Sequence, residues 1–372
     1  MTPQSHGNQG RLRVLIAGGG TGGHVIPALA VARELVERYQ TQVHFLGTAR
    51  GMETKLVPAA GFRLDLIHVG QLNRVSMATK LKTATRLPSA VLRCVRLLRK
   101  FRPHVVLGVG GYASGPAMMA AILTGTPRVA FEPNAVPGMA NRLVGRRVQA
   151  AAVNFPDTAR YFHNPSVTGI PVRSEFFSLP ARPAGAAPQL LVFGGSQGAR
   201  VLNRTMPRIA ASLLDSVPGL TILHQCGAKH LEGMEQTYLQ SPALRGRLRN
   251  SWSVQPFLDD MPQRFAAATL VLCRSGASTV AELAAAAKPS LLVPFPQAAD
   301  DHQRRNAEVL VKAGAAVMIL EPGLTEERLL AELIALLRDR NRLAAMGSKA
   351  RELAHPDAAA AIAALVTQQR GT

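Results

Sequence analysis

The chain contains 372 residues, of which 47% are hydrophobic and 18% are charged. This composition is typical of a folded globular protein and excludes a largely disordered one, and the length is sufficient for two ordinary domains. The formal net charge of +20 indicates a negatively charged partner, namely nucleic acid, an anionic membrane surface or a phosphorylated substrate.

The distribution of charge helps to choose among these partners. Residues 66–131 include no Asp or Glu, and within them the segment 71–102 alternates basic with aliphatic side chains. That pattern is typical of a membrane interface, whereas proteins that bind nucleic acid more often combine basic with aromatic side chains. A solvated helix face that covers the core is the alternative interpretation of the same segment.

The cysteines and the longest uncharged stretch bear on the cellular setting. Cys94, Cys226 and Cys273 are far apart and form no metal or redox motif, so we expect reduced thiols rather than a disulfide scaffold. Residues 105–123 approach the length of a membrane span, but glycines and Pro116 interrupt them. A buried strand, a turn and a helix explain this stretch better, and we predict no transmembrane segment.

Taken in chain order, apolar runs alternate with segments of helical periodicity. The runs predict parallel strands and the periodic segments predict helices, which together indicate two doubly wound α/β domains that meet across a cleft. A proline-rich stretch separates the two halves. The predicted strands are 12–17, 43–46, 104–109, 128–131, 189–193, 220–224, 270–273 and 290–293, and the predicted helices are 25–39, 200–214, 277–287, 302–313 and 326–338. The predicted divisions are a domain at 11–170, a linker at 171–188, a domain at 189–355 and a C-terminal helix at 356–372 that packs back on the first domain.

A glycine-rich segment at residues 18–24 lies between the first strand and the first helix. Such a turn exposes backbone N–H groups at the positive end of a helix dipole and favours phosphate binding. No Lys-Ser/Thr pair follows, and no acidic residue ends the second strand, where Thr48 and Arg50 stand instead. The first absence excludes a Walker loop, and the second disfavours a nicotinamide-dependent oxidoreductase. Close packing of helix on strand is the alternative role for these glycines.

The second half contains two comparable turns. Residues 194–199 place Ser196 at a helix start, and residues 274–277 lead into a helix that carries Glu282. A carboxylate at such an edge can accept hydrogen bonds from both hydroxyls of a ribose. An ordinary exposed glutamate is the alternative.

Together these motifs resemble the MurG family of peptidoglycan glycosyltransferases, in glycosyltransferase family 28, whose fold is GT-B with two Rossmann-like domains. The motifs recur in order and cover nearly the whole chain: Gly-Gly-Gly-Thr-Gly-Gly-His at 18–24, Gly-Gly-Tyr at 110–112, Glu-Pro-Asn at 132–134, Gly-Gly-Ser-Gln-Gly-Ala-Arg at 194–200, Arg-Ser-Gly-Ala at 274–277, Pro-Phe-Pro at 294–296 and Asp-His-Gln at 301–303.

The resemblance implies transfer of N-acetylglucosamine from UDP-GlcNAc to the C4 hydroxyl of the muramic acid in lipid I, which gives lipid II. The implied donor contacts are Thr21, Gly22, Gly23, Asn134, Arg173 and Ser196. The uracil would meet the backbone of Leu258, and Gln303 would approach the sugar. The phosphates and ribose would be surrounded by Ala277, Ser278, Thr279, Val280, Ala281 and Glu282, with Glu282 on the ribose.

The implied reaction inverts the anomeric carbon, so it needs a base for the acceptor hydroxyl and a positive environment for the departing UDP. His24 is the candidate base by residue type and position, with capping of the helix or binding of an acceptor phosphate as its alternative roles. Glu132 is a second, weaker candidate. The family often has His-Glu-Gln-Asn where this chain has Phe131, Glu132, Pro133 and Asn134, and because Phe131 cannot move a proton, a catalytic duty there is doubtful.

No cofactor and no metal are expected, because neither Asp259-Asp260 nor Asp300-Asp301 has the Asp-X-Asp spacing of metal-dependent transferases. The expected partners are UDP-GlcNAc, lipid I, an anionic membrane surface and proteins of cell-wall synthesis or division, with no nucleic acid. The expected place is peripheral, on the cytoplasmic face of the inner membrane. A transferase for another glycolipid and a basic nucleic-acid-binding protein are the rival functions.

Overall fold

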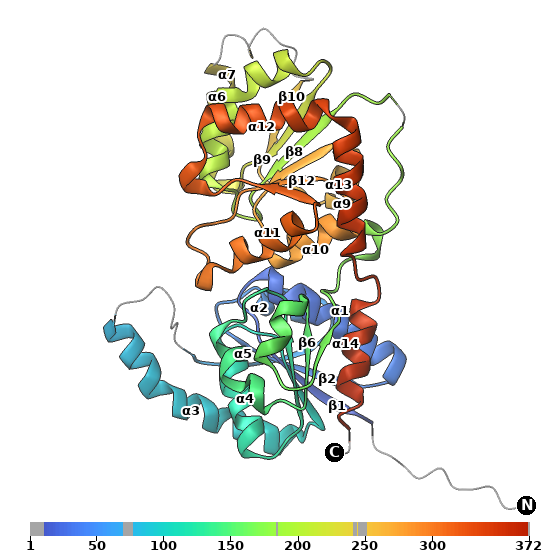
Figure 1. Ribbon diagram of the computed structural model, residues 1–372. Coiled ribbons are helices and arrows are strands. Elements are labelled where there is room, and N and C mark those ends of the chain that lie inside the picture. Colours follow the sequence, from blue (N-terminus) through green and yellow to red (C-terminus); the bar gives the residue numbers. More distant parts are fainter. Residues whose placement is uncertain (1–10, 70–76, 184, 241–243, 245–250, 371–372) are drawn as a thin grey trace, which may run out of the picture. The chain divides into compact units, whose positions relative to one another are not determined.

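The computed structural model describes residues 11–69, 77–183, 185–240, 244 and 251–370, without the side chains of residues 77–86. The chain divides into two compact units (Figure 1). Unit 1 comprises Met1–Pro171 and Asp357–Thr372, and unit 2 comprises Val172–Pro356.

The described part of unit 1 contains a seven-stranded sheet in the order β3-β2-β1-β4-β5-β6-β7. All of its pairings are parallel. The central strands are almost wholly apolar and buried, as expected where both faces of a parallel sheet are covered. Their bounds are β1 Arg13–Ala17, β2 Gln42–Thr48, β3 Arg63–Ile67, β4 Val105–Gly108, β5 Arg128–Glu132, β6 Ala150–Val153 and β7 Pro165–Val167.

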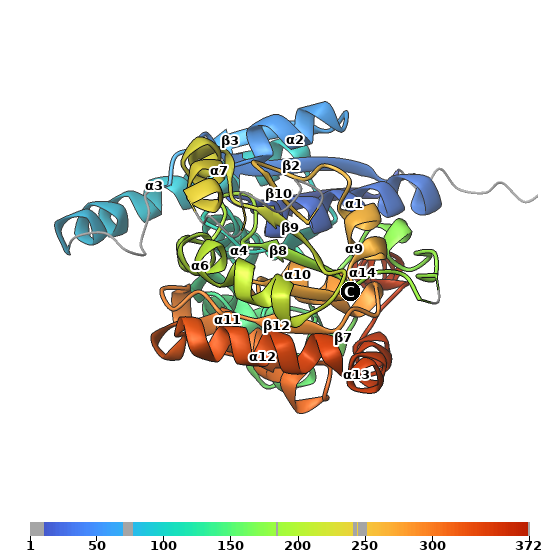
Figure 2. The same cartoon turned by 90° about the horizontal axis from the view of Figure 1, so that it is seen from above.

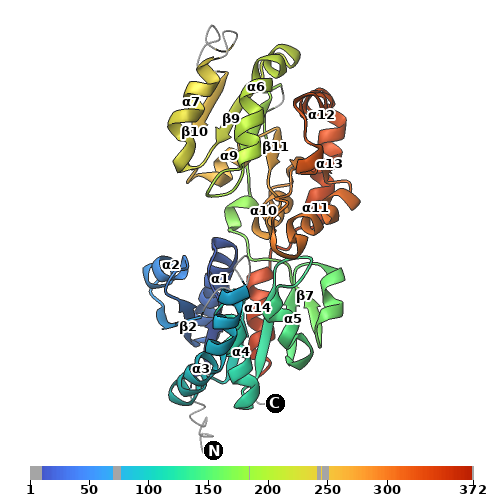
Figure 3. The ribbon, with the colours of Figure 1, turned by 90° about the vertical axis from the view of Figure 1, so that its left-hand side faces the viewer.

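Helices cover both faces of this sheet (Figure 3). On one face α3, α4 and α5 enclose a core with alternate residues of β1, including Leu15 and Ala17. On the other face the last helix of the chain, α14, packs against α1 and against β4, β5 and β6. The helices are α1 Gly22–Tyr39, α2 Glu53–Ala59, α3 Met77–Phe101, α4 Ser114–Leu123, α5 Met139–Val144 and α14 Ala358–Thr367.

The described part of unit 2 contains a six-stranded sheet in the order β10-β9-β8-β11-β12-β13. Its pairings are also parallel. The strands are β8 Gln189–Phe193, β9 Thr221–Gln225, β10 Trp252–Gln255, β11 Leu270–Cys273, β12 Ser290–Leu292 and β13 Ala316–Met318. The sheet thus repeats the doubly wound plan of unit 1.

The main core of unit 2 lies beneath α6 and α12, which pack on each other (Figure 2). On the remaining side α10 packs against α11 and α13. The helices are α6 Arg200–Ser216, α7 Leu231–Gln240, α9 Met261–Ala267, α10 Ala277–Ala285, α11 His302–Lys312, α12 Glu326–Arg338 and α13 Arg340–Glu352. Short 3₁₀ turns are η1 Gly145–Arg147, η2 Pro156–Tyr161, η3 Ser174–Phe176, η4 Ala228–His230, η5 Ala299–Asp301 and η6 Glu321–Gly323.

The predicted alternation of parallel strands and helices is confirmed, and β8, β11 and α12 begin and end where predicted. The sequence pattern missed β3, β6, β7, β10 and β13, which are short or lie toward sheet edges. The stretch 105–123 forms β4, a glycine turn and α4, as predicted. Among the described residues, no helix combines the length and apolarity needed to cross a membrane.

Candidate active site in each unit

In unit 1 the strand order reverses between β1 and β4, where ligands of doubly wound sheets usually bind. The loop 18–24 follows β1, and the turn at Gly110 and Gly111 follows β4. The two contact each other directly, since Gly19 N donates to Gly110 O at 3.3 Å. Gly111 has φ +81°, and a Cβ there would overlap the carbonyl of Gly19. The glycines at these positions therefore allow two backbones to meet at the switch point.

The first glycines of loop 18–24 use their N–H groups inside the protein. Gly18 N donates to Leu46 O at 3.0 Å, and Gly20 N donates to the Glu53 carboxylate at 2.7 Å. These groups cannot serve a ligand at the same time. The N–H groups of a first helical turn have no acceptor within their helix, so Gly22 and Gly23 at the start of α1 carry the candidate donors of this motif.

His24 lies in this first turn of α1 and is partly exposed. Its imidazole packs against Gly110, where an added Cβ would lie 2.9 Å from the ring. Thr21 precedes the helix as its N-cap residue, yet its side chain makes no capping hydrogen bond. The structure therefore brings the motif at 18–24 and the motif at 110–112 around one histidine.

Glu132 ends β5 and is 2% exposed. One carboxylate oxygen accepts from the backbone and side chain of Asn134 at 3.0 and 3.1 Å. The other accepts from Gly138 N and Asn141 Nδ2, both at 3.0 Å. Burial raises the pKa of Glu132, and these hydrogen bonds oppose the rise. The carboxylate thus fixes the loop that carries Asn134. The neighbouring Phe131 is fully buried in the core.

In unit 2 the order reverses between β8 and β11, and the loops 194–199 and 274–277 follow these strands. Ser196 is exposed at the tip of the first loop. Gly198, at φ +74°, leaves no room for a side chain because a Cβ would overlap the Cys226 carbonyl. This close approach fixes the loop against the end of β9.

Gln225, the last residue of β9, is a site component that the sequence analysis missed. It is 4% exposed, and its amide nitrogen donates to Gly195 O at 3.1 Å and to Pro256 O at 3.2 Å. It therefore links the loop of Ser196 to the segment that leads to Leu258, whose side chain is buried. A polar residue that ends a buried apolar strand is the signal that would have identified it.

Glu282 lies on α10, which begins directly after Gly276. Its side chain is partly exposed by surface area, yet the protein around it removes enough water to raise the pKa of Glu282 to about 7, while the charge of Arg173 acts in the opposite direction. On the same helix, the Ser278 hydroxyl oxygen is buried and has no hydrogen-bond partner among the described residues. The rest of the predicted segment, Ala277, Thr279, Val280 and Ala281, forms the first turns of α10.

Gln303 connects the loops that follow β11 and β12. Its side-chain oxygen accepts from Phe295 N at 3.0 Å and from Ser275 N at 3.4 Å. Its backbone oxygen accepts from the Ser275 hydroxyl at 2.8 Å. Because backbone donors orient the amide oxygen inward, the NH₂ group is the end of the side chain that can donate to a ligand.

Two arginines near these loops differ in whether their guanidinium groups are accessible to a ligand. Arg274 is buried and donates to Val293 O and Pro294 O, each at 3.0 Å, and it pairs with Glu321 at 2.7 Å. It therefore belongs to the framework. Arg173 is exposed, and its guanidinium lies 5.2 Å from the ring centre of Phe176.

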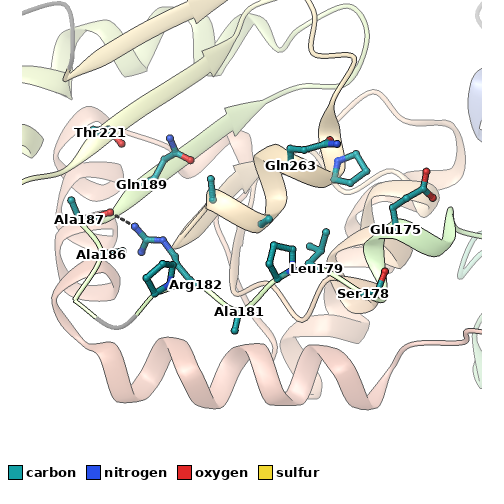
Figure 4. Close-up of a pocket in the computed structure, with 15 residues that line it drawn as sticks. Glu175, Ser178, Leu179, Ala181, Arg182, Ala186, Ala187, Gln189, Thr221 and Gln263 are labelled. Carbon is teal, nitrogen blue, oxygen red and sulfur yellow. Dashed lines mark hydrogen bonds between the residues drawn. The ribbon is translucent and has the colours of Figure 1, made fainter.

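A cavity of about 800 Å³ in unit 2 is a different feature (Figure 4). It is lined by residues 178–183 and by Gln189 and Thr221, which begin β8 and β9. Arg182 and Ala187 both line this cavity, and the Arg182 guanidinium donates to Ala187 O. None of the predicted site residues lines it, because it lies at the amino ends of the strands, whereas the loops described above follow their carboxyl ends.

The acidic pairs considered for metal binding are engaged with arginines. Asp260 pairs with Arg264 at 2.9 Å, and Asp301 lies 3.8 Å from Arg304. Within the described residues, no three His, Cys, Asp or Glu side chains cluster closely enough to hold a metal ion.

Comparisons with known proteins identify the family. The model of the glycosyltransferase family 28 N-terminal domain matches residues 14–153, and that of the C-terminal domain matches residues 189–362. The chain belongs to glycosyltransferase family 28. The resemblance inferred from the motifs is confirmed.

Relatives of this family 28 chain are similar over most of their length. One is the UDP-N-acetylglucosamine--N-acetylmuramyl-(pentapeptide) pyrophosphoryl-undecaprenol N-acetylglucosamine transferase of Solibacter usitatus, 47% identical over 93% of this chain and 92% of the relative. The protein of the same name from a Shewanella species is 43% identical over 94% and 96%. The crystal structure of Acinetobacter baumannii MurG is 33% identical, with a TM-score of 0.82 over 96% of this chain and 99% of that one. The predicted GT-B fold and glycosyltransferase class are thus confirmed.

The predicted residues of this family 28 enzyme form two groups. Thr21, Gly22, Gly23, His24, Glu132 and Asn134 lie at the carboxyl edge of the unit 1 sheet, and Arg173, Ser196, Leu258, Glu282 and Gln303 lie in unit 2. Like Gln225, Glu53 was not among the predicted residues, and it is buried between the end of β2 and the first glycine loop. Its signal was an acidic residue directly after a glycine turn.

Proposed function

We propose that this chain transfers N-acetylglucosamine from UDP-GlcNAc to the muramic acid of the pyrophosphoryl-undecaprenol acceptor, the reaction for which its relatives are named. The observation that carries the donor half is the group formed by two side chains of α10 and Arg173, whose charge acts on Glu282. It combines a partly buried carboxylate at Glu282, a buried unpartnered hydroxyl at Ser278 and the exposed cation of Arg173. These groups match a ribose, a phosphate oxygen and the diphosphate charge respectively.

In this proposal the donor extends across the carboxyl edge of the unit 2 sheet. The uracil lies against the backbone at Leu258, and Glu282 accepts hydrogen bonds from the ribose. The diphosphate lies at the start of α10, near Ser196 and Ser278. As the bond to the sugar breaks, negative charge grows on the leaving UDP, and the helix dipole and Arg173 stabilise it. Gln303 donates its outward NH₂ group to the sugar.

The acceptor half belongs to unit 1. The first turn of α1, with Thr21, Gly22 and Gly23, supplies N–H donors for the pyrophosphate of the acceptor. His24 takes the proton from the acceptor hydroxyl as that oxygen attacks the anomeric carbon, which inverts the centre. Glu132 stays the second candidate for the base. Its four hydrogen bonds favour a positioning role, in which it holds Asn134.

Because the acceptor is a lipid, the enzyme must act at the surface of a bilayer. We propose that α3, α4 and α5 form the face that contacts this surface. These helices pack together and expose Leu92 by 56%, Leu123 by 71% and Leu143 by 64%. The arginines at 142, 146 and 147 are exposed beside them. Aliphatic tips among cations suit an anionic lipid surface. We propose that the enzyme docks there on the cytoplasmic face of the inner membrane. Lys80, Lys82 and Arg86 of the predicted docking segment lie outside the described side chains.

The donor half is tested by isothermal titration with UDP-GlcNAc. The wild type should bind, and Glu282→Ala should weaken binding by about tenfold to a hundredfold, as expected for hydrogen bonds to a charged group. Glu352→Ala is the matched control, because this exposed glutamate of unit 2 pairs with Lys349 on the neighbouring turn of α13. Equal affinity of Glu282→Ala and wild type would remove Glu282 from the site.

The acceptor half is tested by turnover. Lipid I should be glycosylated, and a diacylglycerol acceptor should not. Turnover of the diacylglycerol alone would replace the proposal by a transferase for another glycolipid.

A further inference from the structure

Glu53 is a buried carboxylate to which neither the motifs nor the proposed chemistry gives a role. It begins α2 and is 1% exposed. One oxygen accepts from Gly20 N at 2.7 Å. The other accepts from the Thr48 backbone N–H at 2.9 Å and from the Thr48 hydroxyl at 3.0 Å. Glu53 therefore connects the glycine loop after β1 to the carboxyl end of β2.

The backbone is shaped to admit this carboxylate. A Cβ added to Gly19, Gly47 or Gly51 would overlap the Glu53 side chain. Gly47 and Gly51 have ordinary φ values, so the backbone conformation does not require glycine there. The space taken by the carboxylate is the physical reason for glycine at these two positions.

The next peptide group of the loop is held from the other side. Met52 N donates to Gly20 O at 3.2 Å. Both the N–H and the C=O group of Gly20 are therefore hydrogen-bonded to residues 52 and 53. Glu53 thereby fixes the residue immediately before Thr21, the N-cap of α1. These bonds hold the backbone that leads directly into the first turn of α1, where His24 lies.

We propose that Glu53 is a positioning residue of the transferase, which holds loop 18–24 so that the first turn of α1 and His24 meet the reacting groups. This inference rests on the proposed function. A carboxylate is required because both of its oxygens face N–H or O–H donors. In a glutamine, one end would place an NH₂ group against such a donor, and the bond would be lost.

The test compares Glu53→Gln with Glu34→Gln at a temperature well below the unfolding midpoints of both. Glu34 is the matched control, because it is a glutamate of unit 1 whose partner, Arg38, is exposed. For each variant we would measure kcat and KM with lipid I, the Kd for UDP-GlcNAc and hydrogen exchange at Gly20. We expect Glu53→Gln to lower kcat about tenfold to a hundredfold, the scale of a small misplacement of catalytic groups. The Kd should stay within about twofold, and Gly20 should lose protection.

Two further variants keep the test decisive if Glu53→Gln does not fold. Thr48→Val removes one hydrogen bond to the carboxylate and should lower kcat about threefold, in keeping with the loss of one bond. Gly47→Ala displaces the carboxylate without changing any charge and should reproduce the loss in kcat.

The outcomes separate the two proposals. An inactive wild type would overturn the proposed function. An active wild type with normal kcat in Glu53→Gln, or in Thr48→Val and Gly47→Ala if the first does not fold, would overturn only the role of Glu53. A loss of UDP-GlcNAc affinity in Glu53→Gln as large as its loss of kcat would show general structural damage. That result would also overturn the role of Glu53.

Discussion

Glu282 is held in an environment that opposes its own ionisation. Burial raises its pKa from the ordinary 4.5 to about 7, against the pull of Arg173. Strong perturbation of a carboxyl group by burial beside a specific charge is a common property of binding and catalytic sites. Here it makes ligand affinity and stability depend on pH in opposite directions.

Affinity for UDP-GlcNAc should rise with pH through 7. If the ionised carboxylate is the form that binds the ribose, affinity follows the ionised fraction and increases about tenfold between pH 6 and pH 8. Isothermal titration across this range measures the effect. Glu282→Gln should bind more weakly and show no such rise, and a rise of equal size in that variant would contradict the assignment.

Stability should change in the opposite sense. Because the folded-state pKa lies above the unfolded one, the folded state binds the extra proton, and this stabilisation is complete below about pH 4.5 and lost as pH rises to about 7. Above pH 7, Glu282→Gln should therefore unfold at a higher temperature than the wild type. Calorimetry at pH 5 and pH 8 gives the comparison, and a gain at pH 5 equal to that at pH 8 would refute the linkage.

His24 should affect chemistry rather than donor binding. Loss of a general base costs about a hundredfold or more in rate, so His24→Ala should lower kcat by that factor. UDP-GlcNAc affinity, which we assign to unit 2, should be unchanged. Single-turnover kinetics with lipid I separates the two quantities. A variant with normal kcat and a raised KM for lipid I would instead assign His24 to acceptor binding.

At the scale of elements, the two units hold the loops after their strands with different kinds of side chain. Each sheet reverses its strand order, and glycine loops follow the strands on either side of that point. In unit 1 the buried acids Glu53 and Glu132 hold the loops. In unit 2 the amides of Gln225 and Gln303 do so. Helix starts are thus placed accurately in both, which is the requirement for stabilising charge that develops during reaction.

The exposed leucines of α4 and α5 give a prediction for membrane docking. Leu123→Ser combined with Leu143→Ser should weaken binding to anionic vesicles severalfold, since each loses an apolar side chain that would enter the interface. Co-sedimentation measures the bound fraction. Leu320→Ser in unit 2, at a site exposed by 37%, is the control, and unchanged binding of the double variant would exclude this face.

At the scale of the whole molecule, the chain returns to its first unit at the end. Helix α14 buries Ile362, Ala363 and Val366 in contact with α1 and the centre of the unit 1 sheet. Unit 1 is therefore completed by residues far from it in sequence, although its other elements all precede residue 172.

Removal of residues 357–372 should therefore destabilise unit 1 selectively. The deletion exposes apolar surface of α1 and of β4–β6, and burial of a single side chain such as Ile362 contributes about 1.5–3 kcal/mol. Hydrogen exchange should show lost protection in β4, β5 and β6 and normal protection in β8 and β11. Ile362→Ala should show a milder form of the same pattern. Equal loss in both units would contradict the assignment of α14.

The sequence by itself determined the fold class, the family and the positions of the candidate loops. Continuous apolar runs predict buried parallel strands whatever their neighbours are, and glycines between strand and helix mark where the backbone must approach a ligand or another loop. These are local properties, so β1, β8 and the loops after them could be located without a structure. The motifs in series then specified the family.

Only the tertiary structure decided how the loops are held and which groups remain for a ligand. Gly20 and Glu53 are 33 residues apart, and Gln225 and Gly195 are 30 apart, so no local pattern reports these bonds. The N–H groups of Gly18, Gly19 and Gly20 are used by Leu46, Gly110 and Glu53, so the candidate ligand donors of loop 18–24 are those at the start of α1. The sequence predicted that a C-terminal helix packs back on the first domain, but only the structure shows that α14 covers α1, β4, β5 and β6.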